Sequence, residues 1–330
     1  MKTLFDETII GNINLKNRFF RAAVHQKTQD GHINSDILGL YEKLAQGGAA
    51  ALITGFTLVD AEEKPYPLMA FYDDTFLEEH KKLTNIVHKN NSNIILQLVY
   101  VGSYIMGDAS AVTVLAPSAV ENLNTKIIPE EIKIDQIKTI QEKFAAAALR
   151  AKNAGYDGIE LHAGHGFLLS QFMTPYYNRR TDNYGGSTEN RSRMALETYD
   201  IIRQYVGSDF PILIKVNVTD GFDGGVLFED VLYLCQTLAQ KGIDAIEITG
   251  AWNNLPKEAT SYFRKEAEII AAECKTNVIM TGGNQHFEEM TEILNTTKIE
   301  YFGMARALMK DADLINKFEK QYRQNKADFA

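Results

Sequence analysis

The sequence contains little cysteine, with only Cys235 and Cys274 among its 330 residues. Both fall in segments that we expect to be helical, and neither has neighbouring cysteine or histidine at the spacing of a metal site. We therefore predict two reduced cysteines that serve packing, as is usual for proteins of the cytoplasm.

The sequence also lacks a long apolar run and an excess of basic residues. No stretch approaches the roughly 20 apolar residues of a membrane span, and the chain reaches Asp6 and Glu7 before any apolar stretch develops. We therefore expect no signal peptide, no membrane partner and a cytoplasmic location. The formal net charge is −9, whereas a nucleic-acid backbone is bound by a basic face, so the sequence argues against a nucleic-acid partner.

What the sequence does contain is the composition of an ordinary globular protein, 45% hydrophobic and 23% charged. Short, continuously apolar runs alternate with long amphipathic ones, which favours parallel strands covered by helices. A helical stretch follows each of the eight predicted strands, which are residues 19–25, 49–56, 93–99, 158–162, 212–217, 245–249, 278–281 and 301–304.

The helix predicted after the third strand has the clearest pattern. Its apolar residues recur at three- and four-residue steps, which places them on one face: Ile137, Ile140, Phe144, Ala148 and Ala151. It ends at Gly155, since glycine can take the left-handed cap conformation. The helix predicted over residues 228–241 ends in the same way, before Gly242.

Eight β/α units in succession predict an α/β protein with the TIM (β/α)8 barrel fold, as a single domain over residues 1–330. Residues 9–13 predict a small β-hairpin that caps the bottom of the barrel. Residues 100–129 form an unusually long connection after the third strand, which predicts a lid over the active face.

Two loops at the carboxyl ends of the strands predict a phosphate site. The loops after the seventh and eighth strands of such barrels often bind phosphate. Gly282 and Gly283 follow the seventh strand and leave backbone N–H groups open to an anion. Ala305 and Arg306 follow the eighth strand at the start of a helix, where the helix amino terminus and a guanidinium suit a phosphate monoester.

Two polar side chains interrupt otherwise apolar strands. Lys215 lies within the fifth strand, where burial is costly without an anionic partner. It either forms a structural ion pair with a barrel carboxylate such as Glu160 or Glu247, or directs a cation at negative charge developing on a ligand. Gln97 has a similar place in the third strand, and its amide suits the edge of a heteroaromatic ring.

His162 and His165 lie three residues apart at the end of the fourth strand. Such a pair can bind a metal, satisfy the core, or donate hydrogen bonds to a substrate oxygen. No third metal ligand is evident in the sequence, so we predict no metal. We favour the two histidines as catalytic donors to a substrate oxygen.

The sequence from His162 to Phe167 reads HAGHGF, residues 177–187 read YNRRTDNYGGS, and residues 189–191 read ENR. Together they resemble the Old Yellow Enzyme family of FMN-dependent ene-reductases. The match is nearest to the branch with bacterial NADH:flavin oxidoreductases and the barrel domain of 2,4-dienoyl-CoA reductase. It runs from the LKNR sequence at residues 15–18 to residue 306, and its long central motif is highly specific.

The resemblance implies FMN as cofactor, with its phosphate at the two loops described above. Gln97 would bond the pyrimidine edge of the flavin, and Lys215 matches a cation, usually arginine, beside flavin N1 that stabilises the anionic reduced ring. Phe56 would contact the flavin through its backbone. The segment that matches the lining of the flavin consists of Ala22, Ala23, Val24 and His25.

The resemblance also implies a reaction in two half-reactions. NADH or NADPH passes hydride to flavin N5, and an activated alkene, a quinone or a nitro compound then accepts it, so that ping-pong kinetics are expected. His162 and His165 match the pair that holds the oxygen of an electron-withdrawing group. The other residues expected to contact the substrate are Lys27, Tyr100 and Phe167. Related proteins often form dimers or tetramers, so a homo-oligomer is expected.

Three positions depart from the family pattern. Phe167 stands where most relatives have a tyrosine that protonates the substrate, a role that phenylalanine cannot fill, and acid catalysis commonly contributes about 10²–10⁴-fold. His25 stands where the nearest branch often has cysteine or threonine, and it could tune the flavin potential or donate a proton. Tyr100 and Tyr104 lie where relatives have a His-x-Gly-Arg pattern, and either could supply the missing hydroxyl.

Three other functions remain open. One is an FMN-barrel dehydrogenase that oxidises its substrate, as relatives of trimethylamine dehydrogenase do. Another is a flavin-binding protein with degenerate catalysis. A tRNA-modifying flavin barrel is disfavoured by the net charge of −9. Because no cysteine follows Cys274, we expect neither the iron–sulfur cluster of some branch members nor a second flavin domain.

Overall fold

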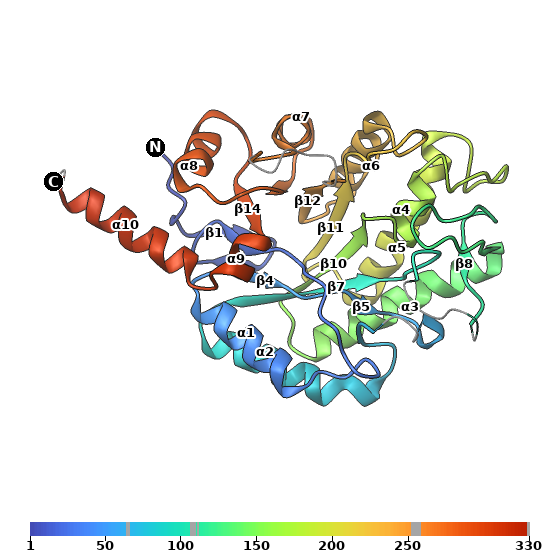
Figure 1. Cartoon of the computed structure of the whole chain (residues 1–330), viewed down its shortest axis with the longest axis horizontal. Helices are drawn as coiled ribbons and strands as arrows, with labels where there is room; N and C mark the ends of the chain where they lie inside the picture. The colour runs from blue at the N-terminus through green and yellow to red at the C-terminus, as the bar shows by residue number, and fades with distance from the viewer. Residues whose placement is uncertain (64–66, 106–109, 111, 252–258, 329–330) are drawn as a thin grey trace.

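The computed structural model describes residues 1–63, 67–105, 110, 112–251 and 259–328. Its central feature is a closed barrel of eight parallel strands (Figure 1). The strands pair in chain order and the last pairs with the first, which closes the barrel. They are β3 (Phe19–Arg21), β4 (Ala51–Ile53), β7 (Asn93–Val99), β10 (Gly158–Ala163), β11 (Ile212–Asn217), β12 (Ala245–Thr249), β13 (Asn277–Thr281) and β14 (Tyr301–Met304). The predicted TIM barrel is confirmed.

Helices follow each barrel strand and cover the outside of the barrel (Figure 1). They are α1 (Ser35–Gln46), α2 (Leu77–Lys89), α3 (Ile134–Asn153), α4 (Leu168–Met173), α5 (Thr188–Val206), α6 (Phe228–Gln240), α7 (Arg264–Glu273), α8 (Phe287–Thr296), α9 (Arg306–Lys310) and α10 (Leu314–Asp328). The five apolar residues predicted on one face of α3 are all buried. Gly155 and Gly242 follow α3 and α6 with φ of 84° and 87°, as their use as helix ends requires.

The first two strands are shorter than predicted. Residues 22–25 and 54–56 were expected to be strand, but the chain leaves the sheet after Arg21 and Ile53. Hydrogen bonds from Ala22 to Met304 and from Thr54 to Ile95 continue the pairing for one residue only. The backbone beyond these points turns over the carboxyl end of the barrel, where side chains from it line a cavity.

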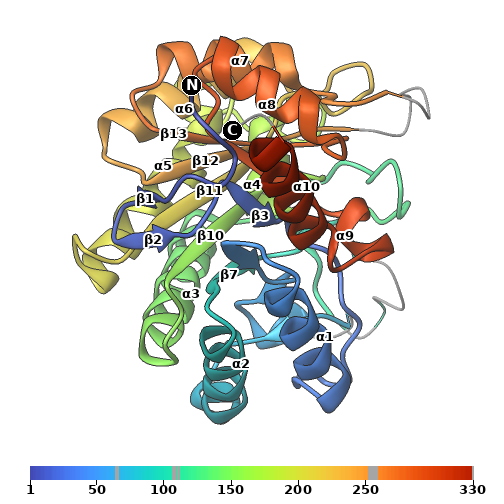
Figure 2. The same ribbon diagram turned by 90° about the vertical axis from the view of Figure 1, so that its left-hand side faces the viewer.

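A hairpin closes the opposite end of the barrel, as the sequence predicted. It consists of β1 (Thr8–Ile10) and β2 (Ile13–Leu15), which pair antiparallel around Gly11 at φ 53°. Its three buried residues pack in one cluster with side chains of the barrel interior, which include Phe20, Ile53, Ile95, Leu213, Ala245 and Ile279. Figure 2 shows the hairpin across this end of the barrel.

Short strands that the sequence did not predict lie in two connections. The one before α2 contains β5 (Thr57–Leu58), the 3₁₀ turns η1 (Ala61–Glu63) and η2 (Asp74–Phe76), and β6 (Met69–Ala70). The predicted lid after β7 contains β8 (Leu115–Ala116), which pairs with β9 (Glu130–Glu131). This connection lies beyond the carboxyl end of β7 (Figure 1), and residues 106–109 and 111 of it lie outside the described residues.

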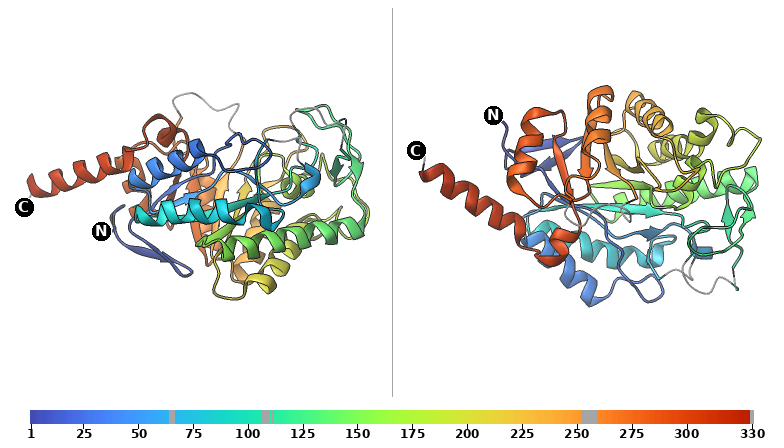
Figure 3. Two further views of the ribbon diagram at one scale, coloured as in Figure 1. Left: turned by 90° about the horizontal axis from the view of Figure 1, so that it is seen from below. Right: turned by 45° about the horizontal axis from the view of Figure 1, so that its top comes forward.

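The last helix, α10, extends away from the barrel, so the carboxyl end of the chain lies far from the strands (Figure 3). Its first half is attached by Phe318, whose ring lies 6.2 Å from Phe19 and 5.7 Å from Phe287. In the part of the chain that the structure describes, no helix has both the length and the apolar character needed to cross a membrane.

Candidate active site

A cavity of about 470 Å³ lies at the carboxyl ends of the barrel strands. Many of the residues predicted from the sequence line it, namely Ala23, Val24, His25, Phe56, His165, Phe167, Lys215, Gly282, Gly283, Ala305 and Arg306. The structure thus gathers into one cavity residues from the ends of six different barrel strands. This is the arrangement expected of catalytic residues in the fold.

The other predicted residues lie around the cavity without lining it. Ala22, Gln97 and His162 are buried in the barrel, and Lys27 is exposed next to the segment that carries His25. Tyr100 is buried, and burial together with the nearby Glu63 raises the pKa of its hydroxyl. Tyr104, in the same segment, does line the cavity.

The loops after β13 and β14 form a cradle of backbone at one end of the cavity. Gly282 and Gly283 have φ of 141° and 80°, and a Cβ atom on Gly283 would lie only 2.8 Å from the backbone nitrogen of Ser261. Only glycine fits there without moving backbone. Arg306 stacks on the ring of Tyr262 at 5.6 Å and donates a hydrogen bond of 3.0 Å to its hydroxyl. A fixed guanidinium beside open backbone N–H groups suits a phosphate.

Lys215 supplies a positive charge to the floor of the cavity. Its side chain is almost completely buried, and its Nζ donates to Glu247 Oε1 at 2.8 Å. The ion pair with Glu247, one of the two roles considered from the sequence, is therefore present. Lys215 also lines the cavity, as its other role, a cation directed at a ligand, requires. The two roles are compatible, since an ammonium has three donors.

The two histidines lie in contact, with His165 on the cavity wall and His162 behind it. His165 Nδ1 lies 3.4 Å from His162 Nε2, and the two rings are nearly perpendicular. The N–H of Gly164 donates to His162 Nδ1, so the proton of a neutral His162 belongs on Nε2, facing His165. His165 then carries its own proton on Nε2, which lies 3.3 Å from Thr249 Oγ1.

Both histidines are held neutral by their surroundings. Burial is the main cause, and it lowers the pKa of His162 well below its usual value and that of His165 to about 3. The positive charge of Lys215 lowers both pKa values further. At neutral pH the pair is therefore a chain of neutral hydrogen-bonding groups and carries no positive charge.

The backbone of His165 is in the left-handed region, at φ 55°, which is unusual for a residue with a side chain. Its N–H donates to Asn217 Oδ1 at 3.1 Å, and Asn217 Nδ2 donates to Asp220 Oδ1 at 2.9 Å. The second oxygen of Asp220 accepts from Thr174 and Val226. Asn217, at the end of β11, thus fixes the conformation that directs His165 to the cavity. The sequence analysis missed it, although its place at a strand end was a signal.

Aromatic rings form the wall opposite the cradle. The ring of Phe56 is parallel to that of His25 at 6.1 Å and lies 4.9 Å from His162. Phe167 contacts Phe56 at 5.2 Å and Tyr104 at 5.5 Å, in both cases edge to face. These rings give the cavity an apolar, aromatic wall.

Further cavity residues come from the loop after β12, which the sequence analysis did not use. Tyr262 and Phe263 line the cavity, and a Cβ atom on Gly282 would come within 2.9 Å of the Phe263 ring. The rule that strand ends carry the site applies to this loop as well, so its place after β12 could have pointed to it. Residues 252–258 of the loop lie outside the described residues.

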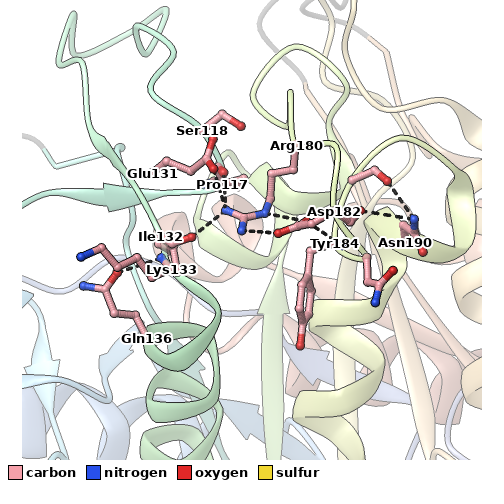
Figure 4. A network of polar contacts seen from close by, with 12 residues as sticks. Pro117, Ser118, Glu131, Ile132, Lys133, Gln136, Arg180, Asp182, Tyr184 and Asn190 are labelled. Atoms are coloured by element: carbon pink, nitrogen blue, oxygen red, sulfur yellow. Dashed lines mark hydrogen bonds and ion pairs between the residues drawn. The ribbon is translucent and has the colours of Figure 1, made fainter.

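The most specific motif of the sequence has a structural role. Arg180 is buried and donates to the backbone oxygens of Pro117 and Ile132 at 2.9 and 2.7 Å, while two of its nitrogens bind Asp182 (Figure 4). Asn190 donates to the backbone of the same turn. The motif therefore ties the connection that contains β8 and β9 to the start of α5. It supports the active face without lining the cavity.

Comparison with known proteins agrees with this geometry. The sequence pattern of the NADH:flavin oxidoreductase / NADH oxidase family matches residues 3–325. The chain belongs to this family. It is 32% identical over 327 residues to a metal reductase of Desulforamulus reducens, covering 96% of this chain and 48% of the relative. It is 30% identical over 337 residues to an NADPH dehydrogenase of Bacillus velezensis, covering 97% and 95%.

Solved structures agree on the fold. A 2-naphthoyl-CoA reductase superimposes with a TM-score of 0.89 at 24% identity, covering 97% of this chain and 52% of that one. The chain thus spans about half the length of that reductase and of the metal reductase, and nearly all of the NADPH dehydrogenase. The resemblance to the Old Yellow Enzyme family is confirmed by this family membership.

The residues present fit FMN. The glycine cradle and Arg306 suit its phosphate, and the Lys215 ammonium suits the negative charge of the reduced flavin ring. Beneath the cavity, the buried oxygen Oε1 of Gln97 has no hydrogen-bond partner within the described part of the chain. An unpaired buried acceptor is costly, and an N–H of a heteroaromatic ring would satisfy it.

Proposed function

We propose that the protein transfers hydride from NADH or NADPH to a small activated alkene, a quinone or a nitro compound, by a ping-pong reaction in this one cavity. The observation that carries the proposal is the cavity itself, which is lined by the glycine cradle, the buried cation Lys215 and the neutral His165, with His162 in contact behind it. When bound, FMN would supply the hydride-transfer chemistry between the nicotinamide and the acceptor.

We assign the cofactor contacts as follows. The backbone N–H groups of Gly282 and Gly283, the amino terminus of the helix after Ala305, and Arg306 would hold the phosphate. Lys215 would face the part of the ring where negative charge gathers, and Gln97 the pyrimidine edge. The cofactor would otherwise be lined by Ala22, Ala23, Val24, His25 and Phe56.

The histidines would bind the acceptor. His165 offers its Nε2–H to the acceptor oxygen, and His162 fixes the ring and tautomer of His165 through the contact at 3.4 Å. Because both are neutral, they polarise the oxygen by hydrogen bonding without transferring charge. Lys27, Tyr100 and Phe167 remain the predicted surroundings of the acceptor.

The choice among acceptors depends on a proton. An alkene needs a proton on carbon after hydride arrives, and Phe167 has none to give. Tyr104 carries a hydroxyl on the cavity wall, with its ring edge to face with Phe167, so we propose it as the donor in place of Tyr100. Quinones and nitro compounds take protons on oxygen, which exchange readily with solvent, and should react faster.

The oxidative half-reaction tests this proposal. FMN-loaded protein, reduced photochemically without oxygen, would be mixed with 2-cyclohexenone, a quinone and a nitroarene while the flavin band is followed. We expect the band to return with all three, fastest with the quinone. A dehydrogenase would instead be bleached by an amine donor in the absence of NAD(P)H. No reaction in either direction would indicate a flavin-binding protein without catalysis.

The proposal includes a cytoplasmic location and a homo-oligomeric state, with neither a nucleic acid nor a membrane as partner. The two free, buried cysteines are compatible with a reducing compartment. Size-exclusion chromatography with light scattering measures the oligomeric state directly.

A further inference from the structure

Beneath the cavity lies a group of four buried polar side chains that the proposed reaction uses only in part. Gln97, Glu160, Lys215 and Glu247 come from β7, β10, β11 and β12, and we call them the interior cluster. The strand register places Glu160 opposite Gln97 and Glu247 opposite Lys215 on the neighbouring strands. Both carboxyl groups are completely buried.

Each of the two carboxyl groups accepts one hydrogen bond from a neighbouring side chain. Gln97 Nε2 donates to Glu160 Oε2 at 2.5 Å, and Lys215 Nζ donates to Glu247 Oε1 at 2.8 Å. The remaining oxygens, Glu160 Oε1 and Glu247 Oε2, have no donor among the described residues. The two carboxyl groups are themselves within hydrogen-bonding reach of each other.

Two ionised carboxylates in this position would repel each other and leave two buried acceptors unsatisfied. One proton between them removes both costs, because a protonated carboxyl donates to the other. We propose that Glu160 and Glu247 share one proton, held on Glu160, so that Glu160 is a neutral acid and Glu247 is the only counter-ion of Lys215.

The partners decide which residue holds the proton. Lys215 is a cation and stabilises the ionised form of Glu247, whereas Gln97 is neutral and stabilises an ionised Glu160 much less. Burial, followed by the charge of Glu247, raises the pKa of Glu160 well above its usual value, which agrees with this assignment.

The shared proton sets the charge below the cavity. A second buried cation, Arg21, lies near the cluster. Burial lowers the pKa of its guanidinium, and the charge of Glu247 is one of the influences that oppose this shift. With Glu160 neutral, the charge of Glu247 balances one of the two cations and leaves one positive charge in excess. This inference rests on the proposed FMN site: the excess charge would favour reduction of the bound flavin. Glu160 and Glu247 are thus positioning residues that act through Lys215.

Midpoint potentials of FMN-loaded variants test the assignment. Glu160→Gln replaces a neutral acid by a neutral amide of the same shape, which still donates to Glu247, so we expect the flavin potential to stay as in wild type. Glu247→Gln removes the counter-ion of Lys215, so we expect a shift to more positive potential. A comparable positive shift with Glu160→Gln would overturn the proposal, because it would mean that Glu160 is ionised in the wild type.

An infrared measurement tests the assignment even if a variant fails to bind flavin. The carbonyl stretch of a buried protonated carboxyl shifts in D₂O, and we expect such a band in the difference spectrum between the wild type and Glu160→Gln. In this difference spectrum the flavin bands and the band of any other buried carboxyl, such as Glu63, cancel. Absence of the band from the difference spectrum would overturn the inference. Since flavin-free protein serves equally well, this result is independent of whether NAD(P)H or any acceptor reacts.

Discussion

At the residue scale, the wall formed by Phe167 and Tyr104 would determine which acceptors react quickly in the proposed reaction. Phe167 packs against His162 at 4.9 Å and is fully buried, so its ring closes the side of the cavity next to the histidines. A hydroxyl on this ring would enter the cavity beside the bound acceptor. Phe167 therefore provides an apolar surface at a position where a tyrosine would provide a proton donor.

Changing this wall should alter alkene turnover selectively. We predict that Phe167→Tyr speeds single-turnover oxidation by 2-cyclohexenone by up to about 10²-fold, because positioned acids contribute on that order. Tyr104→Phe should slow the same reaction, and Phe167→Tyr should rescue it. Oxidation by a quinone serves as control and should change little. If Tyr104→Phe leaves the enone rate unchanged, another group already donates the proton.

A second residue-scale prediction concerns Asn217. Removing its side chain in Asn217→Ala leaves the His165 N–H without its acceptor and releases the left-handed conformation, at a cost of about 1–3 kcal/mol. We expect kcat/KM for the acceptor to fall about tenfold or more, since about 1.4 kcal/mol corresponds to a factor of ten. Photochemical reduction of the bound flavin should be unaffected. Equal loss of flavin binding and acceptor turnover would indicate general unfolding instead.

At the element scale, the loops after β13 and β14 explain how the barrel would hold a phosphate. Gly283 and Gly207 both have φ of 80°, but a Cβ atom on Gly283 meets the backbone of Ser261, whereas nothing lies within 4 Å of a Cβ atom on Gly207. A change to alanine therefore strains the backbone at both positions, but only at Gly283 does the added Cβ atom also obstruct the cradle.

This pair provides a matched test of the cradle. Each glycine-to-alanine change should cost about 1–3 kcal/mol in stability, because both glycines have a positive φ, and Gly207 has ψ of −179°, a conformation nearly confined to glycine. We predict that Gly283→Ala also weakens FMN binding about tenfold or more and narrows the preference for FMN over riboflavin, as measured by fluorescence titration. Gly207→Ala should bind both as wild type does. Equal effects of the two changes on FMN affinity would place the phosphate elsewhere.

Elements were predicted well where local pattern alone decides them. The buried barrel strands β7 and β10 to β14 and the face of α3 follow from runs and periods of apolar residues. Residues 22–25 and 54–56 look like strand because they continue apolar runs, yet tertiary structure takes them out of the sheet, and Ala23, Val24, His25 and Phe56 line the cavity. The Asn217 contact with His165 joins β11 to the end of β10, and no local pattern encodes such a contact.

At the scale of the whole molecule, buried ionisable groups link stability to pH. His80, in α2, is completely buried between Tyr156 and the carbonyl of Ala70, with its ring stacked on Phe71 at 3.9 Å. Burial lowers its pKa to about 4, so the folded protein holds it neutral. The carboxyl groups of Glu63 and Glu160 have the opposite effect, because burial raises their pKa values.

The sign for His80 follows from proton binding. In the unfolded chain histidine binds a proton below about pH 6.5, whereas folded His80 does so only near pH 4, so its contribution is fully present above pH 6.5 and is lost as the pH falls to 4. The loss at pH 4 is on the order of 3 kcal/mol. We predict that urea unfolding at pH 7 and pH 5 shows a smaller pH dependence in His80→Gln than in wild type. An unchanged slope would mean that other groups dominate.

The central claim for the whole molecule is that this cavity reduces bound FMN with a nicotinamide nucleotide. The most direct test is to mix purified, FMN-loaded protein with NADH or NADPH in the absence of oxygen and to follow the flavin absorption band. The account predicts rapid bleaching by at least one of the two nucleotides, before any acceptor is added. A band that persists with both nucleotides would contradict the account.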